Sequence, residues 1–267
     1  MDNKRPKRPS RIVVKLGTNL LTGGKDALDL ETIGSIFAQI ASVKSLGVEV
    51  LIVSSGAVAA GRESLSRTPR KNKLQRGTVA YRQALAALGQ PQLMMTYEQF
   101  FANHQIEVAQ ALISRGDLQS RSRYLNVRNT LDALLSIGAV PIINENDVVA
   151  VEELAGEVYG DNDRLSAMVA NTVDADLLIL LGDMDGLHKT DPHIDPNSEL
   201  ISQVDIIDES IEKSARGPHD LQGSGGMASK LDAARLSTDS GIPMVIASGR
   251  IDGVIESICN GDEIGTR

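Results

Sequence analysis

The chain has 267 residues, 42% of them hydrophobic and 23% charged, which is enough apolar material for a sizeable core. Its net charge of −8 and its aromatic content of 3% argue against a nucleic-acid-binding protein, since such proteins need basic surfaces or stacking platforms. The single cysteine, Cys259, excludes an intrachain disulfide, and no apolar run reaches transmembrane length, so we expect a cytoplasmic protein that does not enter a membrane.

Apolar periodicity predicts strands that alternate with helices along the whole chain. In the first half of the chain we expect strands at 12–16, 48–53 and 108–113, and helices at 29–46, near 79–102 and at 118–137. In the second half we expect strands at 140–143, 177–181 and 244–247. The helices of this half are expected from about 162, at 227–240 and, as a short one, at 253–259. A hairpin is expected at 148–159 and a turn-rich loop at 188–197. This alternation predicts an α/β fold with a mainly parallel sheet covered on both faces.

Two basic stretches stand out from this acidic chain. The first is a tail at 1–10, which we expect to precede a single domain at 11–267. The second is a run between Arg67 and Arg76. A solvated tail and an exposed loop are the simplest interpretations, and an interface or an anion-attracting rim is the alternative.

Two polar clusters adjoin strongly apolar elements. Asn144, Asn146 and Asp147 follow the strand expected at 140–143, and the segment 161–163 (Asp161, Asn162, Asp163) opens a helix. Binding sites of open α/β sheets are built where strands give way to loops and loops to helices. One acidic residue would be enough to cap the helix, and Asp161 fits that role, so the remaining polar residues indicate a ligand.

Three further motifs could face an anion. Lys15 ends the first strand before Gly17, whose missing side chain would let a ligand come close, although a lysine there often only faces solvent. The segment 54–57 opens a helix after the second strand, where an ordinary serine N-cap is the alternative. The glycine-rich loop at 223–229 leads to Lys230; a plain turn would explain its glycines but not the lysine. The four histidines show no metal-ligand spacing.

Taken together, these motifs resemble the glutamate 5-kinase family of the amino-acid kinase superfamily. The matching segments are VVKLGT at 13–18, SSGAVAAG at 54–61, LNVRNT at 125–130, PIINEND at 141–147, GDND at 160–163 and SGGMASK at 224–230. They occur in the family's order and span nearly the whole chain. The resemblance implies a three-layer αβα sandwich forming an amino-acid kinase domain at 11–267, and ATP-dependent phosphorylation of the L-glutamate γ-carboxylate, the first step of proline biosynthesis.

The resemblance also implies roles for individual residues. Lys15 and Lys230 would contact the ATP phosphates, and Asp163 would orient both lysines. Ser55, Asp147 and Asn162 would bind glutamate. The nucleotide site would be lined by Lys15, Gly17, Gly182, Asp183, Ser224, Gly225, Gly226, Met227, Ala228, Ser229 and Lys230. Mg²⁺ would be held mainly by the nucleotide phosphates, with no metal ligand assigned to the protein, and a homo-oligomer is expected.

The chain departs from the family pattern at three points. Gly182 stands where many relatives have threonine, and Arg82 stands where many have lysine. The sequence also ends at Arg267, without the C-terminal PUA module expected in many relatives. We expect catalysis to tolerate all three departures.

The expected chemistry fits the residues. A glutamate side chain, with a pKa of about 4.3, is already ionised at neutral pH, so the nucleophile needs no general base. The catalyst must instead neutralise charge and position the two substrates. Asp147 could pair with the substrate's α-ammonium group, which N-acetylglutamate lacks. Another carboxylate or carbamate kinase of this fold and a non-catalytic amino-acid sensor are the alternatives.

Overall fold

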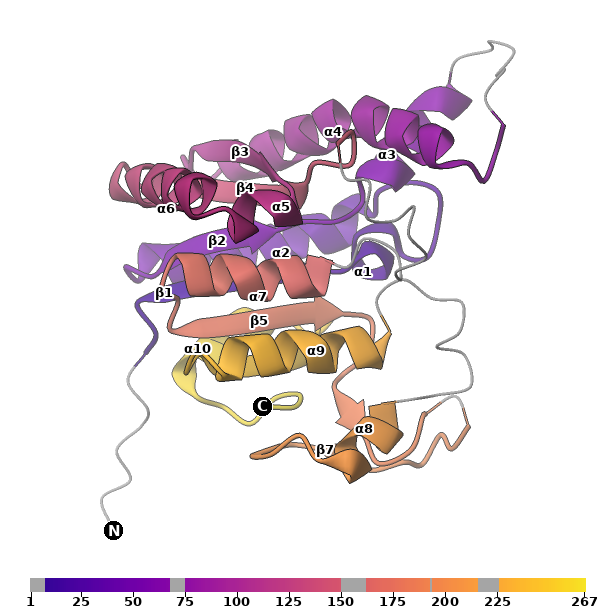
Figure 1. Cartoon of the computed structure of the whole chain (residues 1–267), viewed down its shortest axis with the longest axis vertical. Helices are drawn as coiled ribbons and strands as arrows, with labels where there is room; N and C mark the ends of the chain where they lie inside the picture. The colour runs from indigo at the N-terminus through magenta and orange to yellow at the C-terminus, as the bar shows by residue number, and fades with distance from the viewer. Residues whose placement is uncertain (1–7, 68–74, 150–161, 193, 216–225) are drawn as a thin grey trace.

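A six-stranded sheet lies at the centre of the structure (Figure 1). The computed structural model describes residues 8–67, 75–149, 162–192, 194–215 and 226–267. Within these ranges, the strands of the sheet are β1 (Arg11–Leu16), β2 (Glu49–Val53), β3 (Val108–Ile113), β4 (Val140–Glu145), β5 (Leu177–Gly182) and β8 (Met244–Ser248). They lie in the order β3-β4-β2-β1-β5-β8 and every neighbouring pair is parallel. All their carboxyl ends therefore meet at one edge of the sheet.

Helices cover both faces of this sheet. The described helices are α1 (Thr18–Thr22), α2 (Leu30–Ser45), α3 (Ala57–Ser66), α4 (Val79–Ala102), α5 (Arg115–Gln119), α6 (Arg121–Ser136), α7 (Asn162–Thr172), α8 (Glu209–Ala215), α9 (Met227–Thr238) and α10 (Val254–Asn260). The helices α6, α7 and α9 lie in front of the sheet in Figure 1, and α2 and α10 lie behind it. The predicted three-layer αβα sandwich is confirmed.

The central strand β1 divides the core into two layers. Ile12 and Val14 pack with Phe37 of α2 and Tyr97 of α4. Val13 packs in the other layer, with residues of α6, α7 and α9. Side chains alternate along a strand, so Lys15 must lie on the same side as Val13, the side that α7 covers. The two-residue period of β1 thus directs this lysine towards the first turn of α7.

Local capping sets the ends of α2. The Asp29 carboxylate accepts a hydrogen bond from the Thr32 backbone N–H at 3.2 Å. Gly47 follows the helix with a φ of +84°, a conformation that favours glycine. Between these ends, one face of the helix places Ile33, Phe37 and Ile40 in the core.

The helices α3 and α4 cross with almost no space between them. A Cβ atom on Gly61 would lie 1.9 Å from the Leu85 carbonyl oxygen, and one on Gly89 would lie 1.9 Å from the Ala57 carbonyl oxygen. Only hydrogen fits at either position. Because Ala57 directly follows the 54–56 turn after β2, this crossing also fixes the position of that turn.

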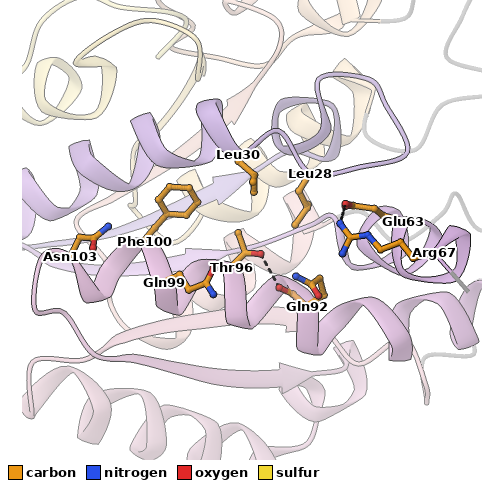
Figure 2. A pocket seen from close by; sticks show the side chains of 9 residues that line it. All are labelled: Leu28, Leu30, Glu63, Arg67, Gln92, Thr96, Gln99, Phe100 and Asn103. Atoms are coloured by element: carbon orange, nitrogen blue, oxygen red, sulfur yellow. Dashed lines mark hydrogen bonds and ion pairs between the residues drawn. The ribbon is translucent and has the colours of Figure 1, made fainter.

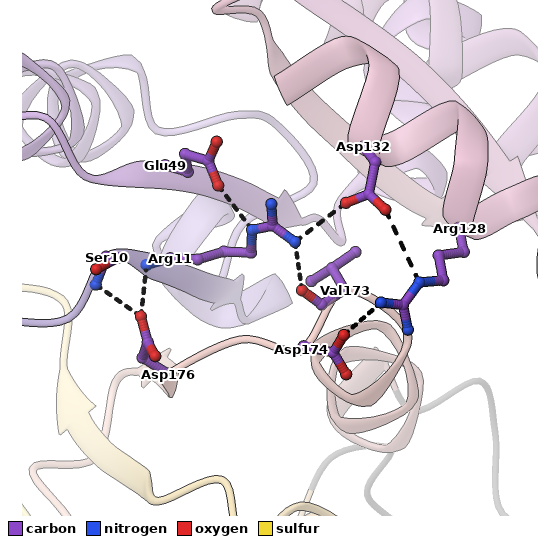
Figure 3. Close-up of polar contacts among 8 residues, drawn as sticks. All are labelled: Ser10, Arg11, Glu49, Arg128, Asp132, Val173, Asp174 and Asp176. Atoms are coloured by element: carbon purple, nitrogen blue, oxygen red, sulfur yellow. Dashed lines mark hydrogen bonds and ion pairs between the residues drawn. The ribbon is translucent and has the colours of Figure 1, made fainter. Parts of the chain in front are cut away.

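An ion-pair network joins the elements at the amino end of β1 (Figure 3). The Arg11 guanidinium donates to Glu49 of β2 at 2.7 Å and to Asp132 of α6 at 3.1 Å, and it also reaches the Val173 carbonyl oxygen. Asp176 accepts from the Arg11 backbone N–H at 2.9 Å. The network therefore holds β1, β2, α6 and the α7–β5 connection together at the edge opposite the carboxyl ends of the strands.

Several element predictions were wrong. The single helix expected at 118–137 is two helices, because Ser120 is extended, with a ψ of 119°, and a Ser114–Asp117 capping box starts α5 at Arg115. His188, expected in a loop, pairs with Leu200 in a short antiparallel ladder of β6 (Leu187–His188) and β7 (Leu200–Ile201). The helices α1 and α8 were not predicted.

Two remaining predictions concern the middle and the end of the chain. Most of the hairpin expected at 148–159 lies outside the described residues. Cys259 lies buried in α10, and burial raises the pKa of its thiol to about 11. Within the described ranges, every helix is too short or too polar to cross a lipid bilayer.

Candidate functional site

Polar side chains gather at the carboxyl edge of the sheet. They come from the ends of β1, β2, β4 and β5 and from the first turns of α7 and α9. Parallel strands bring these ends to one edge although they are far apart in the sequence. This is the edge at which the motif residues were expected to meet.

The centre of the site is a carboxylate held by two lysines. Asp163, in the first turn of α7, is fully buried. Lys15 Nζ forms an ion pair with its Oδ1, and Lys230 Nζ lies 3.1 Å from its Oδ2. Both lysine side chains are largely buried, with exposed fractions of 6% and 12%. The structure therefore brings together three residues that the sequence separates by more than two hundred positions.

The charge of Asp163 is fixed by this arrangement. Burial alone would raise the pKa of its carboxyl, but the ammonium groups of Lys15 and Lys230 outweigh burial and lower the pKa to about 2. A carboxyl whose pKa is lowered on folding stabilises the fold above its ordinary pKa of 3.8 and loses that contribution as the pH falls through the folded value. Asp163 is thus ionised at neutral pH and is suited to hold the lysines, not to accept a proton.

The first turn of α9 lies next to the same carboxylate. Ser229 Oγ donates to Asp163 Oδ2 at 3.0 Å, and Gly226 occupies the N-cap position of the helix. Met227 and Ala228 follow in the first turn. A helix N-terminus presents unpaired backbone N–H groups, which suit an anion. Of the predicted loop residues, Ser224 and Gly225 lie outside the described residues.

Other predicted nucleotide-site residues lie at the ends of β1 and β5. The Gly17 N–H donates to the Leu181 carbonyl oxygen at 2.9 Å, so the two strand ends are joined there. Asp183 accepts a hydrogen bond from Asn19 Nδ2 at 3.3 Å. A Cβ on Gly182 would meet only the Met184 backbone nitrogen, at 3.9 Å, so the backbone leaves space for a Cβ at this position.

A polar cavity of about 470 Å³ has Asn162, the residue that precedes Asp163, in its lining. Its lining includes the three residues predicted to bind the amino acid, Ser55, Asp147 and Asn162. Asn162 Nδ2 donates to the Ser54 carbonyl oxygen at 2.6 Å and to Ser55 Oγ at 3.0 Å. The predicted substrate-binding residues therefore share one cavity, and Asn162 is adjacent in sequence to Asp163.

The cavity also contains cationic groups that sequence reasoning did not assign to it. Lys25, Arg62 and Arg82 lie in its lining, and the Arg62 guanidinium pairs with Asp26 at 2.8 Å. Arg62 and Arg82 flank the basic segment between Arg67 and Arg76. For that segment, an anion-attracting rim was one of the interpretations left open by the sequence. Residues 68–74 of that segment lie outside the described ranges.

The two asparagines of the first polar cluster differ in their surroundings. Asn146 lies in the loop after β4, where its carbonyl oxygen accepts from the Val149 N–H at 3.0 Å. Asn144 was expected in the same loop, but it lies within β4, is 3% exposed and donates to Gln90 Oε1 at 2.9 Å. That prediction was wrong, and the contact between Asn144 and Gln90 was not predicted. Asp161, the predicted helix cap, lies outside the described residues.

The helix that follows the 54–56 turn is not capped by a serine, which was the alternative considered for this segment. Gly56 is the N-cap of α3, with a φ of +95° and no side-chain capping bond. Ser54 is fully buried and shares a hydrogen bond of 2.8 Å with the Tyr97 hydroxyl. The two serines are therefore available for contacts other than capping.

A second cavity, of about 290 Å³, lies beside α2, α3 and α4 (Figure 2). Its two charged residues, Glu63 and Arg67, form an ion pair with each other one turn apart on α3. The rest of its lining is apolar or amide and hydroxyl, including Phe100, Leu28 and Thr96. Glu63 and Arg67 neutralise each other, whereas the larger cavity contains the residues predicted to bind the amino acid, so the polar cavity is the better candidate site.

Comparisons with known proteins bear on this site. Residues 10–248 match the sequence model of the amino acid kinase family. The chain is 49% identical over 259 residues to a glutamate 5-kinase of Dehalococcoides mccartyi, covering 96% of this chain and 68% of that protein. It is 45% identical over 260 residues to a glutamate 5-kinase of Vibrio vulnificus, covering 97% and 66%. The chain spans about two thirds of the length of these relatives.

Solved structures share the fold at much lower identity. The UMP kinase of Bacillus anthracis has a TM-score of 0.62 and 18% identity, over 97% of this chain and 96% of that one. An isopentenyl phosphate kinase of T. acidophilum has a TM-score of 0.62 and 16% identity, over 96% and 98%. At these identities the likeness supports the fold alone.

Proposed function

The chain belongs to the amino acid kinase family, and from that premise we propose that it is a glutamate 5-kinase. It transfers the γ-phosphoryl group of ATP to the γ-carboxylate of L-glutamate, the first step of proline biosynthesis from glutamate. The observation that carries this proposal is the buried Asp163 carboxylate, which holds Lys15 and Lys230 and directly follows Asn162, a residue of the polar cavity.

In this reaction a carboxylate oxygen of glutamate attacks the γ-phosphorus, the bond from that phosphorus to the β-bridging oxygen breaks, and ADP leaves. Two anions must meet, so the main task is to neutralise charge in the transition state. Lys15 and Lys230 supply two ammonium groups, and Gly226 opens a helix whose first N–H groups suit phosphate oxygens. Asp163 keeps the lysines in place and takes no proton.

We assign the amino-acid end of glutamate to the polar cavity. Asp147 is the partner for the α-ammonium group, and Ser55 and Asn162 contact the same substrate. Arg62 and Arg82 place guanidinium groups in the lining of the cavity, and such groups are suited to the carboxylates of glutamate.

Mg²⁺ enters this scheme with the nucleotide. Within the described ranges, no three His, Cys, Asp or Glu side chains converge as a metal site. The ammonium groups of Lys15 and Lys230 are suited to phosphate oxygens, and we propose that those oxygens carry the ion, which would neutralise charge on the transferred group.

The remaining assignments are also proposals. We place the kinase domain at 11–267 after a basic tail at 1–10, and we expect a cytoplasmic homo-oligomer that does not bind nucleic acid. A sedimentation measurement of the full chain tests the assembly.

One assay tests the function. Purified protein should form ADP from ATP only when glutamate is present, and hydroxylamine should trap the acyl phosphate as a hydroxamate. Aspartate, N-acetylglutamate and carbamate as alternative acceptors would reveal a neighbouring kinase. No ADP above background with any acceptor would leave the sensor alternative.

Replacing Asp147 by alanine is expected to raise the KM for glutamate by about 10- to 100-fold, since a charge-assisted hydrogen bond contributes about 1.5–3 kcal/mol. The kcat should stay within about threefold of the parent, because the reacting atoms lie at the other end of the substrate. Asp239→Ala, an exposed residue at the far end of α9, is the matched control. An unchanged KM in Asp147→Ala would remove this residue from the substrate site.

A further inference from the structure

A row of buried polar side chains lies behind the substrate cavity. Gln90 of α4 accepts a hydrogen bond from Asn144 Nδ2 at 2.9 Å, and Asn144 Oδ1 accepts one from Asn162 Nδ2 at 3.1 Å. Their exposed fractions are 8%, 3% and 7%, respectively. The row connects the middle of α4 to the residue that opens α7.

Two backbone groups fix the orientation of every amide in this row. The Glu145 N–H can only donate, and it lies 2.9 Å from Asn144 Oδ1, so that atom is the acceptor. Asn144 Nδ2 must then face Gln90, whose facing atom is Oε1. The Ser54 carbonyl can only accept, and it lies 2.6 Å from Asn162 Nδ2. No amide of the row can be rotated by 180° without placing like groups together.

This orientation decides what Asn162 offers to a ligand. Its Nδ2 is directed to three acceptors, the Ser54 carbonyl, Ser55 Oγ and Asn144 Oδ1. Its Oδ1 is buried and has no hydrogen-bond partner among the described residues, and Asn162 lines the polar cavity. A buried acceptor left without a donor is unfavourable, and a substrate N–H group would remove that penalty.

We propose that Gln90 is a positioning residue that acts through Asn144 to hold Asn162 with its oxygen towards the substrate, so that the site selects a molecule bearing an ammonium group. This inference rests on the proposed function. Together with Asp147, the Asn162 oxygen gives the three N–H groups of an α-ammonium two acceptors. A ligand with a carboxylate or carbonyl at that point would meet oxygen against oxygen.

The test uses three forms of the full chain: the parent, Gln90→Met and Gln90→Glu. Methionine fills a similar volume but removes the acceptor for Asn144. The Gln90→Glu side chain keeps an oxygen that can accept from Asn144. Its second oxygen replaces Gln90 Nε2, which has no hydrogen-bond partner in the described part of the chain. We expect Gln90→Met to raise the KM for glutamate about 10-fold, since an unsatisfied buried donor weakens the network. The kcat and the KM for ATP should change by less than about twofold, and Gln90→Glu should restore the parent KM.

Glutarate separates positioning from general support, because it has both carboxylates of glutamate and no ammonium group. The preference for glutamate over glutarate in kcat/KM should fall by the same factor in Gln90→Met, with glutarate itself unaffected. Equal losses with both acceptors, or no recovery in Gln90→Glu, would mean that the row only supports the fold and would overturn the inference.

Calorimetric binding of glutamate makes the test independent of turnover. A parent protein that binds glutamate without forming ADP would refute the proposed function, while the affinity ratio of parent to Gln90→Met would still decide the inference. A parent that binds no glutamate would overturn both.

Discussion

A Lys230→Ala variant is expected to turn over about 10²–10³-fold more slowly than the parent, because it loses one preorganised cation aimed at the transferred phosphoryl group. The lysine lies 3.1 Å from the Asp163 carboxylate and is 12% exposed, so water replaces its charge poorly. The KM for glutamate should stay within about threefold, since the amino-acid cavity is intact. Steady-state kinetics with both substrates measure the two effects separately.

The matched control for this variant is Lys213→Ala. The Lys213 side chain on α8 is 80% exposed, and its ion pair with Glu209 is long at 3.9 Å and therefore weak. Its removal should leave kcat unchanged. A near-normal kcat in Lys230→Ala would refute the role of this lysine in neutralising the phosphates. Lys15→Ala should behave as Lys230→Ala does, since both lysines contact the same carboxylate.

Replacing Gly89 by alanine is expected to destabilise the protein by about 3 kcal/mol. The new methyl group would lie 1.9 Å from the Ala57 carbonyl oxygen and 2.3 Å from the Gly61 nitrogen, both backbone atoms that side-chain rotation cannot move. The helices α3 and α4 must separate, and the 54–56 turn must shift with α3. Urea unfolding followed by circular dichroism gives the free energy of unfolding.

Gly116→Ala provides the comparison for this variant. Gly116 is also helical, but a Cβ there would meet only Ser114 Oγ, at an ordinary 3.8 Å. We expect unchanged or slightly increased stability, because alanine restricts the unfolded chain more than glycine does. Equal stability of the two alanine variants would show that the crossing of α3 and α4 tolerates separation.

The fold was predictable wherever one face of an element is buried over several residues. The helix expected near 79–102 forms with those bounds although Pro91 lies inside it. Apolar periodicity cannot detect strands of two residues such as β6 and β7, and it did not predict the seven-residue helix α8. It also missed the break at Ser120, because the pattern on either side of that residue is helical and only the backbone changes direction.

The candidate site was predictable to the extent that motifs end strands or begin helices. Lys15 and Asp163 meet because β1 is next to β5 and α7 packs over β1. Asn144 was misjudged because the apolar run ends at Ile143, whereas the pairing with β3 continues through Leu112 and Asn144. Gln90 carries no local signal: its contact with Asn144 spans 54 residues and depends on how α4 packs on the sheet.

Asn162 and Asp163 are consecutive residues at the start of one helix, yet they face different groups. One side chain lines the amino-acid cavity, and the other holds the lysines. On the proposed assignment, the residue that contacts glutamate and the residue that positions both lysines are one peptide unit apart, about 3.8 Å between their Cα atoms. Movement between helices cannot change this spacing, so the contact to glutamate and the carboxylate that positions the lysines move together. The protein should therefore select its acceptor by chain length, because a substrate with one methylene fewer or more would place its carboxylate away from the phosphorus.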